Sequence, residues 1–356
     1  MSIKQIIRPE IAALSAYHVP SSDGYVKLDA MENPFPLPAA LQAELAQHLA
    51  ALPLNRYPVP SYVGLKALIA EQLAVPAGRE IVLGNGSDEL IAILSQACAR
   101  PGAKVLAPVP GFVMYAMSAR FAGLEFVGVP LNADFTLDAA AMLAAIAVHR
   151  PVITYLAYPN NPTGTLFDAA DIVAILQAVG SSGIVVVDEA YGPFAGVSFM
   201  DRLAQFPNLV VMRTVSKLGL AGIRLGYMAG DNELMKEFDK VRPPYNINVL
   251  TEASAVFMLR HVEVLNAQAA ELCRQREALT ATLRALPGVE VFPSAANFLL
   301  IRVANAEQVF AKLLKHKILV KNVGKMHALL ENCLRITVSN QEENALFSAA
   351  FAASLP

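Results

Sequence analysis

The residue of this sequence best placed to do chemistry is Lys217, which follows Ser216 and precedes two glycines, Gly219 and Gly222. A short apolar run at 209–212 leads into the segment and is typical of a buried strand. Lysine is rarely buried unless it is paired or used chemically. Beside hydroxyl and arginine side chains, such a lysine can form a Schiff base with pyridoxal phosphate while its neighbours hold the phosphate. A surface loop with a solvated lysine is the alternative, because short motifs predict function only loosely.

A glycine-containing turn at 84–88 joins a predicted strand to a predicted helix. Gly84 and Gly86 let backbone N–H groups approach an anion, and the helix N-terminus adds a favourable partial charge. Ser87 or Asp88 can equally serve as an ordinary helix cap. The spacing fits neither a Walker loop nor a G-x-G-x-x-G motif. Phosphate binding and simple capping therefore both remain open for this turn.

A second turn, at 158–164, contains two prolines and a glycine directly after an apolar strand. Such a turn is rigid, and the side-chain amide of Asn161 can donate a hydrogen bond from it. A turn without function is the simpler interpretation, although the order Asn-Asn-Pro-Thr-Gly is less common than a generic turn.

A third candidate is Asp188, which ends the apolar run at 185–187. A carboxylate in such a place needs a cationic partner. A protonated pyridine nitrogen is one, and the pairing would keep the ring able to withdraw electrons. A Mg²⁺ ion held by Asp188 and Glu189 is a second possibility, but the sequence lacks the Walker loop that usually accompanies it. The third possibility is that Asp188 only caps a helix.

The elements that position these residues alternate between strand and helix from about residue 80 onward. This order predicts an α/β fold: a large domain whose mostly parallel sheet is flanked by helices. Ligands in such sheets bind beyond the carboxyl ends of the strands, where the candidate residues fall. The predicted strands are 81–83, 103–107, 124–129, 152–157, 184–187 and 209–212. One predicted helix runs from the turn at 84–89 to about residue 99, and the others span 112–121, 138–148 and 168–179.

The remaining segments suggest three parts. Prolines punctuate residues 1–36, which we expect to form an N-terminal arm. Residues 37–275 form the predicted large domain, and 276–356, with part of the arm, a smaller α+β domain. Further helices are expected at 37–52, 61–73, 250–286, 307–316 and 342–352, and further strands at 297–303, 318–321 and 333–338.

Composition narrows the class of protein. Lys and Arg number 28 against 30 Asp and Glu, so a general nucleic-acid binder is not expected. The scattered Cys98, Cys273 and Cys333 predict neither disulfides nor a zinc site, and we expect no metal. The N-terminus lacks a signal-like apolar core, and no apolar run is long enough to cross a membrane. We therefore expect a cytoplasmic protein.

Taken together and in order, these motifs resemble those of the fold-type-I pyridoxal-phosphate aminotransferases, over nearly the whole chain. In closer detail they are similar to the histidinol-phosphate aminotransferases within that family. The segments that carry the resemblance are 27–34, 56–58, 84–89, 160–164, 188–191, 216–227, 244–248 and 333–338.

The resemblance implies roles for individual residues. Lys217 carries the cofactor and shuttles the proton, Asp188 pairs the pyridine nitrogen, and Tyr191 with Asn161 binds the phenolic oxygen. Phe112 stands where the family usually has a ring-stacking Tyr. Phosphate-binding residues implied by the family are Gly86, Ser87, Asp88, Thr214, Ser216, Arg224 and, from the neighbouring subunit of a homodimer, Tyr57.

The resemblance also implies a substrate site. Arg335 matches the arginine that binds the substrate anion, and Lys321 would add a second cation unless it is only a solvated edge-strand lysine. Tyr17 and Tyr245 match substrate-contacting tyrosines, with simple packing as the alternative. The expected reaction is amino transfer between histidinol phosphate and 2-oxoglutarate in histidine biosynthesis. An aromatic amino acid aminotransferase, a threonine-phosphate decarboxylase and a non-enzymatic regulatory module are the alternatives.

Three positions depart from the family pattern. Lys217 and Arg224 are seven residues apart, one fewer than in many relatives, so the placement of the phosphate arginine is in question. Met31 replaces an Asn that is common in the arm, and Phe112 replaces the usual Tyr.

Overall fold

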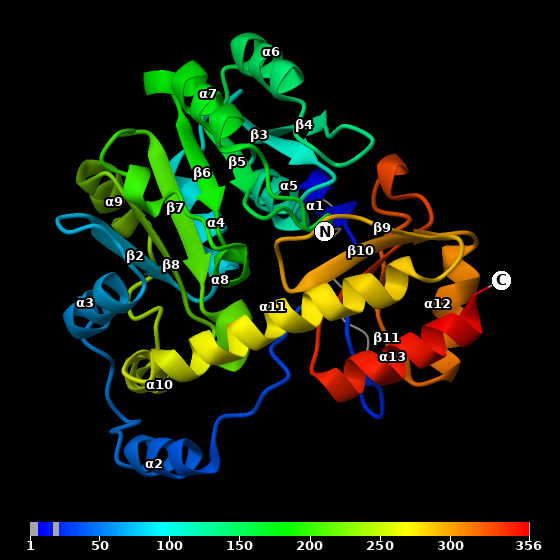
Figure 1. Ribbon diagram of the computed structural model, residues 1–356. Coiled ribbons are helices and arrows are strands. Elements are labelled where there is room, and N and C mark those ends of the chain that lie inside the picture. The colour runs from blue at the N-terminus through cyan, green and yellow to red at the C-terminus, as the bar shows by residue number, and fades with distance from the viewer. Residues whose placement is uncertain (1–5, 17–20, 356) are drawn as a thin grey trace.

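The computed structural model describes residues 6–16 and 21–355. Its centre is a seven-stranded sheet in the order β2-β8-β7-β6-β5-β3-β4 (Figure 1). Only β8 runs antiparallel to its neighbours, and the other adjacent strands pair in parallel. The strands are β2 (Glu80–Gly84), β3 (Lys104–Val109), β4 (Glu125–Pro130), β5 (Ile153–Ala157), β6 (Ile184–Asp188), β7 (Leu209–Thr214) and β8 (Gly226–Gly230).

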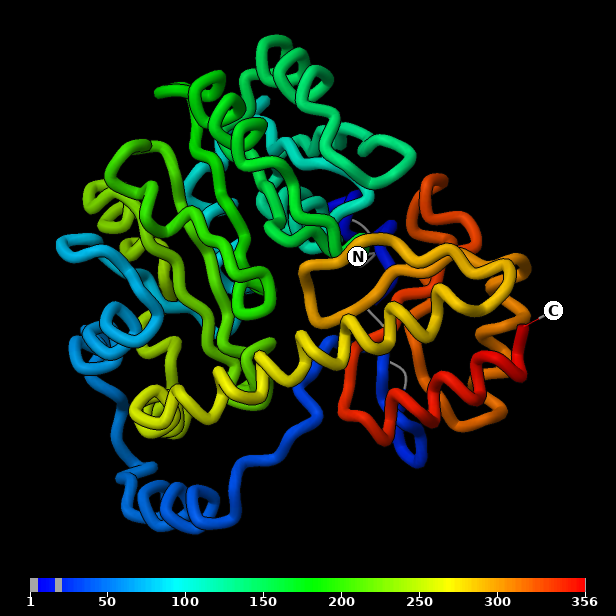
Figure 2. Tube along the Cα trace, viewed as in Figure 1, coloured from blue at the N-terminus to red at the C-terminus, as the bar shows by residue number. Residues whose placement is uncertain are grey.

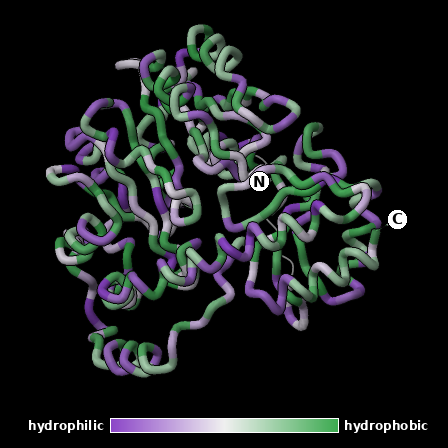
Figure 3. Tube along the Cα trace, viewed as in Figure 1, coloured by the Kyte–Doolittle hydropathy of each residue, from purple (hydrophilic) through white to green (hydrophobic). Residues whose placement is uncertain are grey.

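Helices cover both faces of this central sheet, because successive strand side chains point to opposite sides. Val186 packs into one buried cluster, with α4 (Ser87–Ala97), α5 (Val113–Phe121) and α9 (Asn232–Asp239). Val185 and Val187 pack into the other, with α3 (Val63–Gln72), α6 (Ala139–His149) and α7 (Ala169–Val179). The largely apolar strands are green in Figure 3. The predicted mostly parallel sheet with helices on both faces is confirmed.

The structure differs from the predicted elements in several places, among them the following three. Strand β8 was not expected, because glycine at both of its ends is unusual in a strand. Helix α9 was also missed. The single helix expected at 250–286 is two, α10 (Val249–Leu259) and α11 (Val262–Arg284), separated at Arg260 and His261.

A smaller antiparallel sheet lies in the C-terminal region, in the order β12-β13-β10-β9. Helix α11 reaches it as one long helix from beside the central sheet (Figure 1). Our division between domains at 275/276 falls inside α11, and the division remains a prediction. The elements here are β9 (Val289–Val291), β10 (Phe298–Val303), α12 (Ala306–Lys315), β11 (Ile318–Leu319), β12 (Lys321–Asn322), β13 (Cys333–Thr337) and α13 (Gln341–Ser354).

The N-terminal arm is tied to this C-terminal region. Strand β1 (Val26–Lys27) pairs in parallel with β11, and Figure 2 shows the blue arm running among the red and orange C-terminal segments before it crosses to α2 (Ala39–Ala50). Two short helices, α1 (Pro9–Ala12) and α8 (Gly192–Ala195), complete the α-helices of the described residues. None of the helices in this part of the chain is long and apolar enough to cross a membrane.

Candidate active site

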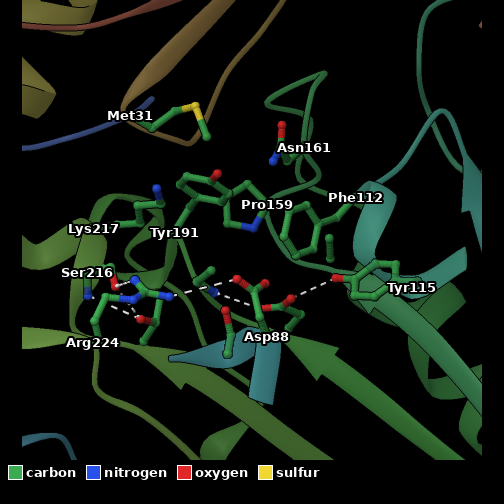
Figure 4. A pocket seen from close by; sticks show the side chains of 15 residues that line it. Met31, Asp88, Phe112, Tyr115, Pro159, Asn161, Tyr191, Ser216, Lys217 and Arg224 are labelled. Carbon is green, nitrogen blue, oxygen red and sulfur yellow. Dashed lines mark hydrogen bonds and ion pairs between the residues drawn. The ribbon is translucent and has the colours of Figure 1, made fainter. Parts of the chain in front are cut away.

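A cavity lies at the carboxyl edge of the central sheet, and most of the residues predicted to bind a cofactor line it (Figure 4). They come from the ends of different strands, as expected for a parallel sheet. These lining residues are Ser87, Asp88, Phe112, Asn161, Asp188, Tyr191, Thr214, Ser216, Lys217 and Arg224.

Lys217 follows β7, and its side chain enters the cavity, so the surface-loop alternative does not hold. Its Nζ donates a hydrogen bond of 3.0 Å to the carbonyl oxygen of Ala30 in the arm. Burial first and the positive charge of Arg335 second lower the pKa of the amine to about 8. Much more of the amine is therefore neutral and nucleophilic near neutral pH than for an ordinary lysine.

The anion cradle is built from the turn before α4 and from the loop after Lys217. Gly86 stands at the N-cap of α4, so neither Ser87 nor Asp88 is the cap, and the simple capping interpretation fails. A Cβ on Gly86 would lie 2.5 Å from Nη2 of Arg224, so the guanidinium packs directly against this backbone. Helix N–H groups and an arginine thus face the same corner of the cavity.

The shortened step from Lys217 to Arg224 still brings the arginine to this corner. Gly219 has φ 133° and Arg224 has φ 54°, and these two left-handed residues turn the chain sharply. Arg224 Nη1 lies 3.5 Å from Oγ of Ser216, and Nη2 lies 3.8 Å from Oδ2 of Asp88. Figure 4 shows both contacts at the bottom of the cavity.

Asp188 is buried at the end of β6. It accepts a hydrogen bond of 2.7 Å from the hydroxyl of Tyr115 and one of 3.1 Å from the N–H of Ala190. Burial raises its pKa to about 6, and the hydrogen bond from Tyr115 opposes that rise. Among the described residues no lysine or arginine bonds this carboxylate, so it lacks the cation that a buried charge requires.

Glu189 takes no part in this cavity, which argues against a magnesium pair with Asp188. Its side chain points to the other face of the sheet and forms an ion pair of 2.8 Å with Nη2 of Arg213. It also accepts hydrogen bonds from Ser198 and from the N–H of Phe199.

Arg335 joins the arm, the Asn161 turn and the small sheet. Its Nη1 donates a hydrogen bond of 2.7 Å to Oδ1 of Asn161, and its Nη2 donates one of 2.7 Å to the carbonyl oxygen of Asp29. Lys321 lies directly opposite Arg335 in the pairing of β12 with β13. Side chains directly opposite each other share a face of a sheet, so the two cations are neighbours.

Some of the described residues that were predicted for the site do not themselves line the cavity: Tyr57, Gly86, Tyr245, Lys321 and Arg335. Tyr57 and Tyr245 are exposed, and their rings stack with centroids 4.5 Å apart. Tyr17, also predicted to contact substrate, lies outside the described residues.

Sequence reasoning did not name Tyr115 or Met31 as site residues, although the side chains of both line the cavity. Tyr115 lies one helical turn after Phe112, and its position in an apolar helix resembles that of an ordinary core aromatic. The available signal was the phenol hydroxyl of Tyr115, a polar group in an apolar helix that begins soon after a strand ends.

Comparison with known proteins identifies the family. Residues 23–350 match the family described as aminotransferase class I and II. The chain belongs to this family. It is 65% identical to histidinol-phosphate aminotransferase 2 of Cupriavidus pinatubonensis, over 99% of this chain and 97% of that protein. It is 63% identical to histidinol-phosphate aminotransferase 1 of Ralstonia nicotianae, over 99% of this chain and 95% of that protein.

Solved structures agree with this assignment. Histidinol-phosphate aminotransferase from Sinorhizobium meliloti, in complex with pyridoxal 5′-phosphate, matches with a TM-score of 0.88 at 25% identity and covers 98% of this chain and 97% of that one. An L-threonine-O-3-phosphate decarboxylase from Porphyromonas gingivalis matches with a TM-score of 0.78 at 24% identity, over 92% and 98% of the two chains. The second likeness shows the shared fold alone.

The aminotransferase is a pyridoxal-phosphate enzyme, and its cavity fits that cofactor by its own chemistry. The buried carboxylate of Asp188 lacks a cation, and a protonated ring nitrogen supplies one. The Gly86 backbone and the guanidinium of Arg224 leave no space for a Cβ, as expected of a phosphate cradle. Lys217 lies in the same cavity with a lowered pKa. The predicted phosphate and ring residues are therefore compatible with the cofactor, while their individual roles stay predictions.

Proposed function

We propose that this aminotransferase exchanges an amino group between L-histidinol phosphate and 2-oxoglutarate, as a step of histidine biosynthesis. One structural observation carries the proposal: Arg335 and Lys321 lie directly opposite each other in the pairing of β13 with β12, and Arg335 donates a hydrogen bond to Asn161 in the cavity wall. Arginine binds carboxylate and phosphate bidentately, and a neighbouring lysine adds the second charge that suits a dianionic phosphate. The names of the relatives at 65% and 63% identity support the same choice.

The chain's own residues have distinct tasks in this reaction. The cofactor, when bound, supplies the electron-withdrawing ring that stabilises negative charge at the amine-bearing carbon. Asp188 holds the ring nitrogen protonated, and Tyr191 with Asn161 orients the ring. Nζ of Lys217 accepts the proton from the amine-bearing carbon and returns it, a role that its pKa of about 8 suits.

A substrate panel tests the proposal. Purified protein with histidinol phosphate and 2-oxoglutarate should release glutamate, and phenylalanine or tyrosine should react far more slowly. Brisk turnover of the aromatic amino acids alone would support an aromatic aminotransferase. Release of carbon dioxide from threonine phosphate without a keto acid would support the decarboxylase.

Variants of Lys321 test the observation that carries the proposal. Lys321→Met should raise KM for histidinol phosphate by about tenfold, because the phosphate loses one charge-assisted contact. Lys321→Arg should keep most of the affinity. An unchanged KM in Lys321→Met would show that this lysine is only a solvated edge residue.

We also propose that the enzyme is a cytoplasmic homodimer with shared sites. Exposed apolar side chains gather on the segment before α3 and at the start of α10, where the α3 and α10 helices contact each other. An apolar surface of this kind is typical of an interface. The side chains are Leu54, Tyr57, Val59, Val63, Tyr245 and Leu250, with exposed fractions of 67%, 79%, 69%, 69%, 43% and 43%.

Mixed dimers test whether Tyr57 serves the partner's site. A dimer of one Lys217→Ala chain and one Tyr57→Ala chain has one intact site if Tyr57 crosses the interface, and none if it acts within its own chain. The first arrangement should recover about half of the wild-type activity per mixed dimer, since two-fold symmetry gives two equivalent sites. Recovery no higher than that of the parent variants would contradict the shared site.

A further inference from the structure

Met31 is held in an unusual conformation at the wall of the active site. Its φ is 54°, in the left-handed region that costs a non-glycine residue about 1–2 kcal/mol. Its side chain is only 6% exposed and lines the cavity with Lys217 and Tyr191. Strained backbone of this kind persists only where the surroundings over-determine it, and it is concentrated at functional sites.

Side chains of the C-terminal region hold Met31 in this conformation. Its N–H donates a hydrogen bond of 2.9 Å to Oγ1 of Thr337, and its carbonyl oxygen accepts one of 3.0 Å from Nδ2 of Asn297. Two residues earlier, the carbonyl oxygen of Asp29 accepts from Arg335. Thr337, Asn297 and Arg335 are all buried, so this part of the arm cannot relax without breaking buried hydrogen bonds.

These contacts also fix where Met31 lies relative to a substrate. In Figure 4 its side chain is across the cavity from Ser216 and Arg224, above Tyr191 and near Lys217. The same arm segment contacts Arg335, the residue expected to bind the substrate anion. We therefore expect a substrate anchored by Arg335 and reacting near Lys217 to place its carbon skeleton beside Met31.

We propose that Met31 is a specificity-determining residue, whose thioether forms the apolar wall against which the ring of histidinol phosphate packs. The inference rests on the proposed function, because histidinol phosphate is the substrate that carries an aromatic ring. Thioether sulfur makes favourable contacts with aromatic rings, whereas an apolar wall forms no stabilising interaction with the side-chain carboxylate of glutamate. The three rotatable bonds of Met let one wall serve both substrates.

Two substitutions separate this role from a structural one. Met31→Asn removes the apolar wall, yet Asn tolerates the left-handed conformation better than Met. We expect Met31→Asn to lower kcat/KM of the histidinol phosphate half-reaction by about tenfold and to leave that of the glutamate half-reaction within about twofold. Met31→Leu keeps an apolar side chain of similar volume and should stay within about threefold of wild type in both.

Measurements other than turnover complete the test. The thermal midpoint of Met31→Asn should be equal to or higher than that of wild type, because backbone strain is relieved. The Kd of histidinol phosphate for the borohydride-reduced enzyme, measured by calorimetry, should rise with the loss in kcat/KM. An equal loss in both half-reactions, or no loss with the ring substrate, would overturn the role of Met31 while wild-type turnover still upholds the proposed function. Absence of wild-type turnover of histidinol phosphate would overturn both.

Discussion

The hydroxyl of Tyr115 donates a hydrogen bond of 2.7 Å to Oδ2 of Asp188. Burial raises the pKa of Tyr115 well above its ordinary value, and the charge of Asp188 raises it further, so the phenol stays protonated and remains a donor. The ring of Tyr115 is fixed by stacking on Tyr155, with centroids 4.3 Å apart and planes 3° from parallel. Tyr115 is thus a positioning residue that holds the carboxylate and favours its charged form.

Tyr115→Phe should weaken the binding of pyridoxal phosphate by about tenfold or more, because a hydrogen bond to a charged group contributes about 1.5–3 kcal/mol. Its loss should also raise the pKa of Asp188 above the wild-type value of about 6. Only the ionised carboxylate can pair a ring cation, so the affinity of the apoenzyme for the cofactor falls as pH drops through this pKa. In the variant the fall should begin at higher pH, measured by fluorescence titration across pH 5–8.

Tyr155→Phe is the matched control for this substitution. It removes a buried hydroxyl from the same ring stack without touching Asp188. A pH profile that moves equally in both variants would show that packing, and not the hydrogen bond, is responsible.

The sequence predicts the lining of the cavity well because polar residues that end apolar strands are conspicuous. Asp188, Asn161 and Lys217 each follow such a run, and parallel strands bring their carboxyl ends to one edge. Strand β8 was missed because Gly226 and Gly230 conceal its pattern. Tyr115 was missed because the sequence of an apolar helix does not indicate that one of its tyrosines donates a hydrogen bond to a carboxylate at the end of a strand.

The contribution of the arm could not be predicted for a different reason. The hydrogen bond from Lys217 to Ala30 spans 187 positions, and the one from Arg335 to Asp29 spans 306. Contacts so distant in sequence depend on the tertiary fold and leave no local periodicity. The left-handed backbone of Met31 and Arg224 is equally invisible, because neither residue type favours it.

The lowered pKa of Lys217 leads to a prediction about cofactor capture by the apoenzyme. The neutral amine is the reactive form, so the rate of capture should rise with pH and level off above a midpoint of about 8. Arg335 contributes to the lowering by its charge. Arg335→Gln should therefore raise the midpoint, while Arg335→Lys, which keeps the charge, should leave it near the wild-type value. Stopped-flow absorbance from pH 6.5 to 9.5 measures both, and an unchanged midpoint in Arg335→Gln would contradict the coupling.

Gly86→Ala should abolish the close packing of the cradle. The new Cβ would lie 2.5 Å from Nη2 of Arg224 and would displace the guanidinium from the anion corner. We expect the Kd for pyridoxal phosphate to rise at least about tenfold, from the loss of one charge-assisted hydrogen bond. The positive φ of 80° adds a folding cost of about 1–2 kcal/mol, which must be separated from the effect on binding.

Gly102→Ala provides that separation. Gly102 has a similar φ of 74°, but a Cβ there would meet nothing within 4 Å. The two variants should lose similar thermal stability, whereas only Gly86→Ala should lose cofactor affinity. Equal cofactor affinity in the two variants would argue against the cradle.

The buried ion pair behind the active site gives a prediction about stability. Glu189 has a fully buried side chain, and Arg213 lies 2.8 Å from it while also donating to Ser198 and to the carbonyl oxygen of Leu73. Arg213→Met should lower the free energy of unfolding by about 3–5 kcal/mol, because it leaves a buried carboxylate without its cation.

The exposed pair of Lys325 and Glu307 is the control for that loss, with an N–O distance of 3.0 Å and side chains 84% and 75% exposed. Lys325→Met should cost at most about 1 kcal/mol, since water screens the charges. Urea unfolding of the two variants compares them directly.

The pair of Glu189 and Arg213 clamps the residue next to Asp188 to strand β7, which ends just before Lys217. Arg213→Met should therefore also weaken cofactor binding, and a variant with full stability and full affinity would show that the pair contributes to neither.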